Sequence, residues 1–123
     1  MIQNISQEIT LHSFILFGSQ ARGNTLPHSD YDIVIIGEFS KPYLERLEWI
    51  IKIAPLVAID LFCYTPEEFD RKFKEYNLTA IDAIDEGIFL FDDGLTEKYV
   101  KKLEFFKEKG MKKEGDLLFS FEI

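Results

Sequence analysis

The chain has 123 residues, 46% of them hydrophobic and 29% charged, and its 22 acidic against 14 basic side chains give a net charge of −8 at pH 7. This length and balance exclude a disordered or fibrous chain and predict a single domain over residues 1–123. The negative charge repels phosphate backbones, so the composition argues against general binding of nucleic acid.

The sequence has no recognisable export or membrane signal. No apolar run approaches the ~20 residues that cross a bilayer, and the first residues show no basic region followed by an apolar stretch. The single cysteine, Cys63, lies in an apolar run and is expected to be a small core residue in a reducing compartment. We therefore expect a soluble, cytoplasmic protein without membrane contact.

The first half of the chain predicts a short, weak helix and then two buried strands, over residues 13–17 and 32–36. A helix is predicted over residues 42–54, where apolar side chains recur at helical spacing. They are Leu44, Leu47, Ile50, Ile51 and Ala54. Ser40 is expected to cap this helix, and Pro55 stops it.

A third strand is predicted over residues 56–64, ahead of a helix with a strong start signal. Thr65 can cap this helix, Pro66 suits its first position, and Glu68 completes a capping box with Thr65. The inner face of the helix is expected to carry Phe69, Phe73 and Tyr76.

The second half continues the alternation of helices and strands. A helix over residues 77–86 ends at Gly87, a strand covers residues 88–91, and another helix covers residues 96–109. Residues 112–123 alternate between apolar and polar side chains, which fits either an edge strand or an exposed apolar tail that awaits a partner chain.

Aromatic residues are dense in the predicted strands, and their spacing favours core packing over stacking with nucleobases. They are Phe14, Phe17, Phe62, Phe89 and Phe91. Strands that alternate with helices predict an α/β or α+β fold, with a sheet of about four strands covered by helices.

The first chemical signal is the segment Gly-Ser-Gln-Ala-Arg-Gly at residues 18–23, directly after the first strand. Glycine has no side chain in the way, so backbone N–H groups and a serine hydroxyl can approach an anion closely. Gly18 and Ser19 are therefore candidates for phosphate binding, and Arg22 offers a planar donor fork for a further phosphate contact. The alternatives are an ordinary turn and, for Arg22, a solvated surface charge.

Two carboxylates follow at the start of the second strand. Asp30 and Asp32 are two residues apart, so in an extended segment both project from the same face and repel each other. A bound divalent cation that prefers hard oxygen ligands, such as Mg²⁺, would stabilise the pair. The alternative is a solvated loop that tolerates both charges.

Asp60 is a lone acid within the apolar run of residues 56–64. An unpaired carboxylate buried there would be costly, so the side chain must face a solvated cleft, meet a basic partner or bind a cation. The alternative is a position on the solvent side of an edge strand. Together with the acidic pair and the Gly-Ser turn, Asp60 favours a metal site.

These segments together resemble the minimal nucleotidyltransferases of the DNA polymerase β superfamily. The resemblance rests on the Gly-Ser turn at residues 18–23, on the pair Asp30 and Asp32, and on Asp60 in its apolar strand after one crossover helix. It covers residues 13–94 and leaves residues 95–123 as a C-terminal helix and tail. If the turn and the acidic pair meet at one site, the first two strands run antiparallel and the sheet is mixed.

The resemblance implies transfer of a nucleoside monophosphate from a triphosphate to an acceptor hydroxyl, with two Mg²⁺ ions. Asp30 and Asp32 would hold the ion that clamps the triphosphate and share the second ion. Asp60 would complete the site of the second ion and accept the proton of the acceptor hydroxyl. Gly18 and Ser19 would hold the terminal phosphates.

Three functions remain open at this point. Minimal members of the family commonly act beside a helical HEPN-domain partner as antitoxins, so the resemblance implies a cytosolic enzyme that transfers AMP from ATP, or a related group from another triphosphate, to a tyrosine of such a toxin. The second possibility is a non-catalytic antitoxin that neutralises its partner by contact. The third is the nucleotidyltransferase half of a small-molecule modifier.

Four further polar residues are expected to lie outside the site. His12 and His28 are expected on the surface, because nothing at their spacing makes them ligands. Asp92 and Asp93 precede a glycine, which is typical of an ordinary turn.

Overall fold

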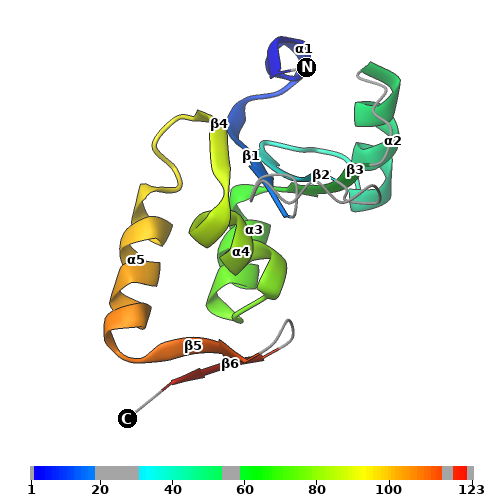
Figure 1. Cartoon of the computed structure of the whole chain (residues 1–123). Coiled ribbons are helices and arrows are strands. Elements are labelled where there is room, and N and C mark those ends of the chain that lie inside the picture. The colour runs from blue at the N-terminus through cyan, green and yellow to red at the C-terminus, as the bar shows by residue number, and fades with distance from the viewer. Residues whose placement is uncertain (1, 19–30, 54–58, 115–117, 122–123) are drawn as a thin grey trace.

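The computed structural model describes residues 2–18, 31–53, 59–114 and 118–121, which form five α-helices and six strands (Figure 1). The helices are α1 (Ile2–Glu8), α2 (Tyr43–Ile53), α3 (Pro66–Lys74), α4 (Leu78–Glu86) and α5 (Glu97–Glu108). The strands are β1 (Leu11–Phe17), β2 (Tyr31–Gly37), β3 (Ile59–Tyr64), β4 (Ile88–Asp92), β5 (Met111–Glu114) and β6 (Leu118–Phe121). The helices and strands predicted before residue 110 are thus confirmed within the described residues, with small differences at their ends, whereas Ala54, Pro55 and the predicted strand start at residue 56 lie outside the described residues.

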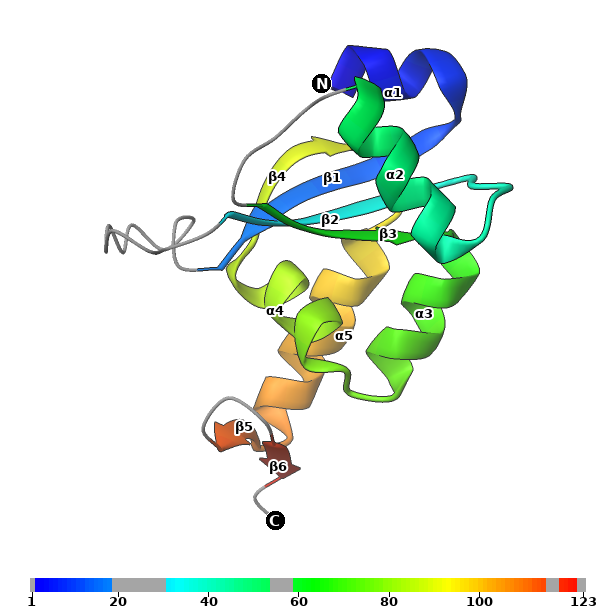
Figure 2. The ribbon, with the colours of Figure 1, turned by 90° about the vertical axis from the view of Figure 1, so that its right-hand side faces the viewer.

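Four of the strands form a mixed sheet in the order β3-β2-β1-β4. β1 lies antiparallel to both β2 and β4, whereas β2 and β3 are parallel. The chain crosses between the two parallel strands through α2, as a parallel pair requires (Figure 2). The predicted mixed sheet and the antiparallel course of its first two strands are confirmed.

Helices cover both faces of the sheet, with α1 and α2 on one face and α3, α4 and α5 on the other (Figure 2). Because side chains alternate along a strand, each strand contributes to both faces. Phe17 and Val34 belong to the cluster that packs on α3, α4 and α5. Phe14, Ile35 and Cys63 belong to the cluster that packs on α1 and α2. The core positions predicted for Phe14, Phe17 and Cys63 are therefore confirmed.

The start of α3 is fixed by the predicted capping box and by an ion pair. Thr65 Oγ1 accepts a hydrogen bond from the Glu68 N–H at 3.2 Å, and Glu68 Oε1 accepts one from the Thr65 N–H at 2.8 Å. Arg46 of α2 is only 6% exposed and places Nη1 2.5 Å from Glu68 Oε1. Burial would raise the pKa of Glu68, but the hydrogen bonds from Arg46 and Thr65 outweigh it and hold the pKa below its usual value. The pair ties α2 to α3.

Two expectations about helix ends are wrong. α3 ends before Tyr76, whose φ of 58° is incompatible with a continuing helix and whose side chain is 40% exposed. Ser40 does not cap α2, because the helix begins at Tyr43 and the Pro42 carbonyl accepts the hydrogen bond from the Arg46 N–H.

Several apolar residues lie at the surface. The core position expected for Phe89 is wrong: this residue is 38% exposed, and its neighbours Ile88 and Leu90 are 46% and 51% exposed. The reason is that β4 is an outer strand of the sheet. On α2, Leu44 and Ile51 are also exposed, so the buried stripe of that helix is narrower than its apolar pattern.

β5 and β6 pair antiparallel with each other in a separate two-stranded sheet (Figure 2). Of the two alternatives for residues 112–123, the structure supports a strand over Leu118–Phe121. This strand pairs with β5, however, and not with the edge of the main sheet.

The longest helix, α5, has 12 residues. Within the part of the chain that the structure describes, no helix is long and apolar enough to cross a membrane.

Candidate active site

Gly18, Asp32 and Asp60 lie side by side at one end of the main sheet. Phe17, the residue before Gly18, is the cross-strand partner of Asp32, and Asp32 is the partner of Asp60 in the parallel ladder of β2 and β3. Neighbouring strands lie ~4.8 Å apart. Three consecutive strands therefore each bring one predicted site residue to the same row.

The backbone at Gly18 requires a glycine. Its φ is +90°, a conformation that other residues rarely adopt. A Cβ atom at this position would lie 2.3 Å from Oδ2 of Asp32, far inside contact distance. The glycine directly after β1 thus lets the main chain approach the Asp32 carboxylate closely, and phosphate binding at Gly18 stays a prediction.

Both carboxylates project from the sheet face that α3, α4 and α5 cover. Asp32 and Asp60 lie two residues before Val34 and Phe62, which pack in or against the core cluster of that face. Asp60 is exposed and Asp32 is partly exposed. Asp60 lies on the outer strand β3 and is exposed to solvent, which was the alternative to a metal site. It also lies directly beside the carboxylate of Asp32.

The donor chemistry of this pair fits a hard divalent cation. Two carboxylates on neighbouring strands repel each other, and oxygen ligands are those that Mg²⁺ prefers. Among the described residues no group of three or more His, Cys, Asp or Glu side chains comes together. Asp32 and Asp60, two of the three predicted ligands, lie together, and their role in metal binding stays a prediction.

The remaining predicted site residues lie outside the described part of the chain. They are Ser19, Arg22 and Asp30, all within residues 19–30. Their predicted roles in phosphate and metal binding stay predictions, as does the surface position of His28.

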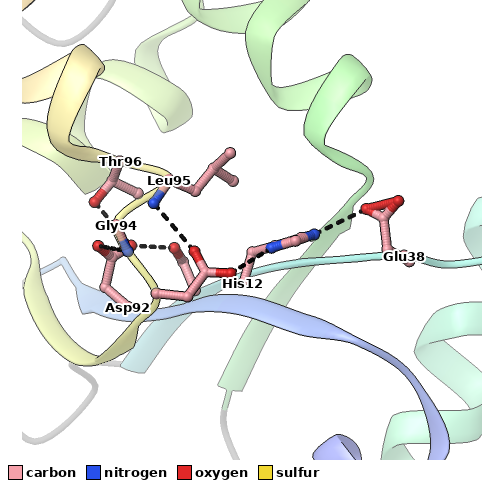
Figure 3. A network of polar contacts seen from close by, with 8 residues as sticks. His12, Glu38, Asp92, Gly94, Leu95 and Thr96 are labelled. Carbon is pink, nitrogen blue, oxygen red and sulfur yellow. Dashed lines mark hydrogen bonds and ion pairs between the residues drawn. The ribbon is translucent and has the colours of Figure 1, made fainter.

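A second polar cluster, which the sequence analysis missed, lies at the opposite end of β1 (Figure 3). His12 Nδ1 lies 2.6 Å from Asp93 Oδ2, and His12 Nε2 lies 2.9 Å from Glu38 Oε2. Burial would lower the pKa of His12, but the two carboxylates outweigh it and raise the pKa above the usual value of 6.5. The same contact keeps the pKa of Asp93 low, against the opposing effect of burial.

Asp92 joins the same end of the sheet to α5. Its carboxylate accepts hydrogen bonds from the Ser13 hydroxyl, from Thr96 Oγ1 at 2.8 Å and from the Gly94 N–H at 3.0 Å (Figure 3). Asp92 is the last residue of β4 and not part of a turn, Asp93 leads into the bend at Gly94, and both side chains hydrogen-bond to residues of β1. No local signal could reveal this, because His12 and Asp93 are 81 positions apart in the sequence.

Comparisons with known proteins identify the family of the chain. A family model described as nucleotidyltransferase domain matches residues 2–123. No curated protein matches the sequence.

Three solved structures share the fold. One, a toxin–antitoxin with AMP-PNP, is 19% identical and has a TM-score of 0.56, with 87% of this chain and 84% of that chain covered. A Tyr-to-Ala mutant of the toxin–antitoxin MntA–HpeT is 20% identical with a TM-score of 0.55, over 87% of this chain and 83% of that chain. A mutant of the same pair with two Asp-to-Glu changes, two positions apart, is 17% identical and has a TM-score of 0.56, with 87% of this chain and 84% of that chain covered.

Likeness at these identities establishes the fold, and the family model covers nearly the whole chain. The resemblance read from residues 13–94 is therefore confirmed, and the chain belongs to the nucleotidyltransferase domain family.

Proposed function

We propose that the protein transfers AMP from ATP to an acceptor hydroxyl in a Mg²⁺-dependent reaction. The observation that carries this proposal is the row of Gly18, Asp32 and Asp60 on three adjacent strands. It places a glycine backbone in close contact with the first of two neighbouring carboxylates, which are suited to a divalent cation.

Each residue has a separate role in this proposal. Asp30, Asp32 and Asp60 hold two Mg²⁺ ions, which when bound neutralise the triphosphate and stabilise the charge that develops on the attacking and leaving oxygens. Gly18 and Ser19 bind the terminal phosphates, and stabilisation there favours departure of pyrophosphate. Because Gly18 directly follows β1 and Asp60 lies on β3, the phosphate-binding residues and the proton acceptor lie on opposite sides of Asp32.

The transfer step forms one bond and breaks one. The acceptor oxygen attacks the α-phosphorus of ATP as its proton passes to the Asp60 carboxylate. The bond between the α-phosphorus and the bridging oxygen to the β-phosphate breaks, and pyrophosphate leaves with that electron pair. The products are an AMP ester of the acceptor and pyrophosphate.

We further propose that the acceptor is a tyrosine of a HEPN-type toxin and that the protein is its antitoxin in the cytoplasm. Support comes from the structural neighbours, which are toxin–antitoxin pairs, one of them with the ATP analogue AMP-PNP and another with a tyrosine substitution.

Neutralisation by contact alone is the second candidate. The exposed apolar strand β4, with Ile88, Phe89 and Leu90 at the surface, favours it because such a strand is suited to binding another protein.

Growth assays on cells that express the toxin separate the two candidates. Neutralisation by transfer predicts that Asp32→Asn and Asp60→Asn variants fail to rescue growth although they still bind the toxin. Full rescue by both variants would refute transfer as the means of neutralisation and leave contact. Circular dichroism of the purified variants checks that each is folded.

A further inference from the structure

A cleft of about 570 Å³ opens along β3 on the face from which Asp60 projects. Phe62, Tyr64 and Tyr43 form its aromatic side, Arg71 and Lys72 of α3 form its basic side, and Thr79 at the start of α4 contributes to its end. The volume lies in the range of sites that bind small molecules or peptide side chains.

The cleft lies next to the candidate active site along β3. Asp60 and Phe62 lie two residues apart on one face of β3, a separation of ~6.6 Å along the strand. The Phe62 ring lies 6.2 Å from the ring of Phe17, which precedes Gly18. From Phe62 the aromatic side runs on to Tyr64 at 6.5 Å and from there to Tyr43 at 5.9 Å. Asp60 is not itself a lining residue of the cleft, but a ligand that extends from the cleft past Phe62 would reach it.

The charge of the cleft differs from that of the chain. Arg71 and Lys72 supply two positive charges, and Lys72 Nζ lies 5.5 Å from the centre of the Tyr64 ring. Glu68 at the cleft wall is already paired with the buried Arg46, which leaves Glu75 as the opposing charge. The cleft is thus locally positive in a protein of net charge −8, so it favours an anionic ligand.

The order of the strands assigns the cleft to the acceptor side of the reaction. In phosphoryl and nucleotidyl transfer, the attacking and leaving oxygens lie roughly in line through the phosphorus. Gly18, the proposed contact of the leaving phosphates, directly follows β1, and Asp32 on β2 lies between it and Asp60. The attacking hydroxyl must then come from the β3 side, where the cleft opens.

Strand pairing is not the means of recognition here. The carbonyl groups of Leu61 and Cys63 accept hydrogen bonds from Tyr43 Oη, at 3.4 Å, and from Arg46 Nη1, at 3.1 Å. These contacts cover the outer edge of β3, which is an outer strand of the sheet. A ligand beside β3 is therefore held by the side chains of the cleft.

We propose that this cleft is an acceptor subsite for an acidic polypeptide segment. An aromatic side chain of the segment packs against Phe62 and Tyr64, and a neighbouring carboxylate pairs with Arg71 and Lys72. The hydroxyl to be modified then lies at Asp60. This inference rests on the proposed transfer reaction and specifies the chemistry of its acceptor.

Two labelled peptides test the subsite without nucleotide. Each carries one tyrosine, flanked by aspartates in the first and by lysines in the second, and binding to the full-length protein is measured by fluorescence anisotropy. The double variant Arg71→Glu, Lys72→Glu should bind the acidic peptide at least about fivefold more weakly than the wild type. The control variant Lys74→Glu, Lys101→Glu makes the same charge change at two lysines that are each 73% exposed and outside the cleft, and it should bind normally.

Affinity for MgATP, measured on the same proteins, separates the subsite from the reaction. The proposal predicts unchanged MgATP affinity in the cleft variant and a raised KM for the protein acceptor at similar kcat. A cleft variant that loses MgATP affinity would place the nucleotide in the cleft and overturn the proposal, as would equal binding of the two peptides by the wild type. If the peptide result holds but no nucleotide is transferred by the wild type, the subsite stands and the proposed reaction fails.

Discussion

Replacing Gly18 by alanine should impair stability and transfer by two separable effects. The positive φ costs an L-residue about 1–2 kcal/mol, which at about 4 °C per kcal/mol for a chain of this size lowers Tm by about 4–8 °C. The added Cβ would also lie 2.3 Å from Asp32 Oδ2, where ordinary contact begins at 3.4 Å. Asp32 must therefore shift by about 1 Å, and a misplacement of that size costs about 100-fold in rate.

Gly94→Ala is the matched control, because Gly94 has a φ of +103° and no atom within 4 Å of the position of a Cβ. It should lower Tm by a similar amount, measured by differential scanning calorimetry, and leave the rate of AMP transfer within about twofold of the wild type. The decisive comparison is the initial rate of label transfer from α-labelled ATP. If Gly18→Ala transfers label at the wild-type rate, or if Gly18→Ala and Gly94→Ala lose the same fraction of the rate, the contact between Gly18 and Asp32 is not the cause of the lost activity.

Three other predictions concern the rest of the fold. The Glu68→Ala variant leaves Arg46 buried without its carboxylate partner, so urea unfolding should show a free energy of unfolding lower by about 3 kcal/mol. The double variant Arg46→Met, Glu68→Ala should lose less unfolding free energy than the sum of the losses in the two single variants. The pKa of His12 is raised in the folded state, so the stabilisation from this residue is fully present below pH 6.5 and is lost as the pH rises through the folded-state pKa. The pKa of Asp93 is lowered, so the stabilisation from that residue is present above pH 3.8 and is lost as the pH falls through the lowered pKa. The difference in unfolding free energy between wild type and His12→Gln should therefore be larger at pH 6 than at pH 9, and a difference that grows with pH would contradict the pairing. Burial raises the pKa of the Cys63 thiol to about 12, so iodoacetamide should label this residue only after denaturation, and rapid labelling at pH 8 in the folded state would show that it is accessible.

Local patterns in the sequence predicted the elements of this fold well. The capping box of Thr65 and Glu68 involves residues three apart, so it can be predicted from the local sequence alone. The exposure of Phe89 did not follow, because the position of β4 at the edge of the sheet depends on strand order. The contacts of His12 with Asp93 and Glu38 likewise depend on segments that are distant in the sequence.

In the candidate site, too, residue types could be predicted from the local sequence, whereas the spatial arrangement could not. The residue types of Gly18, Asp32 and Asp60 pointed to metal and phosphate chemistry before any geometry was known. Their common row on three strands required the register of two ladders, which no pattern within one strand determines. Nothing in the sequence marked Arg71 and Lys72, because two basic residues on a polar helix are common, and only the neighbouring aromatic strand gives them a cleft to line.

Transfer of label from α-labelled ATP tests the central claim most directly. Purified protein is incubated with MgATP and with the protein encoded by the adjacent gene, next to Asp32→Asn and Asp60→Asn variants. The proposed reaction predicts label on a tyrosine of the partner, with a rate at least about 1,000-fold lower in each variant, which corresponds to about 4 kcal/mol of transition-state stabilisation. Label that appears equally with wild type and both variants, or no transfer from any nucleoside triphosphate while the partner still binds, would contradict it.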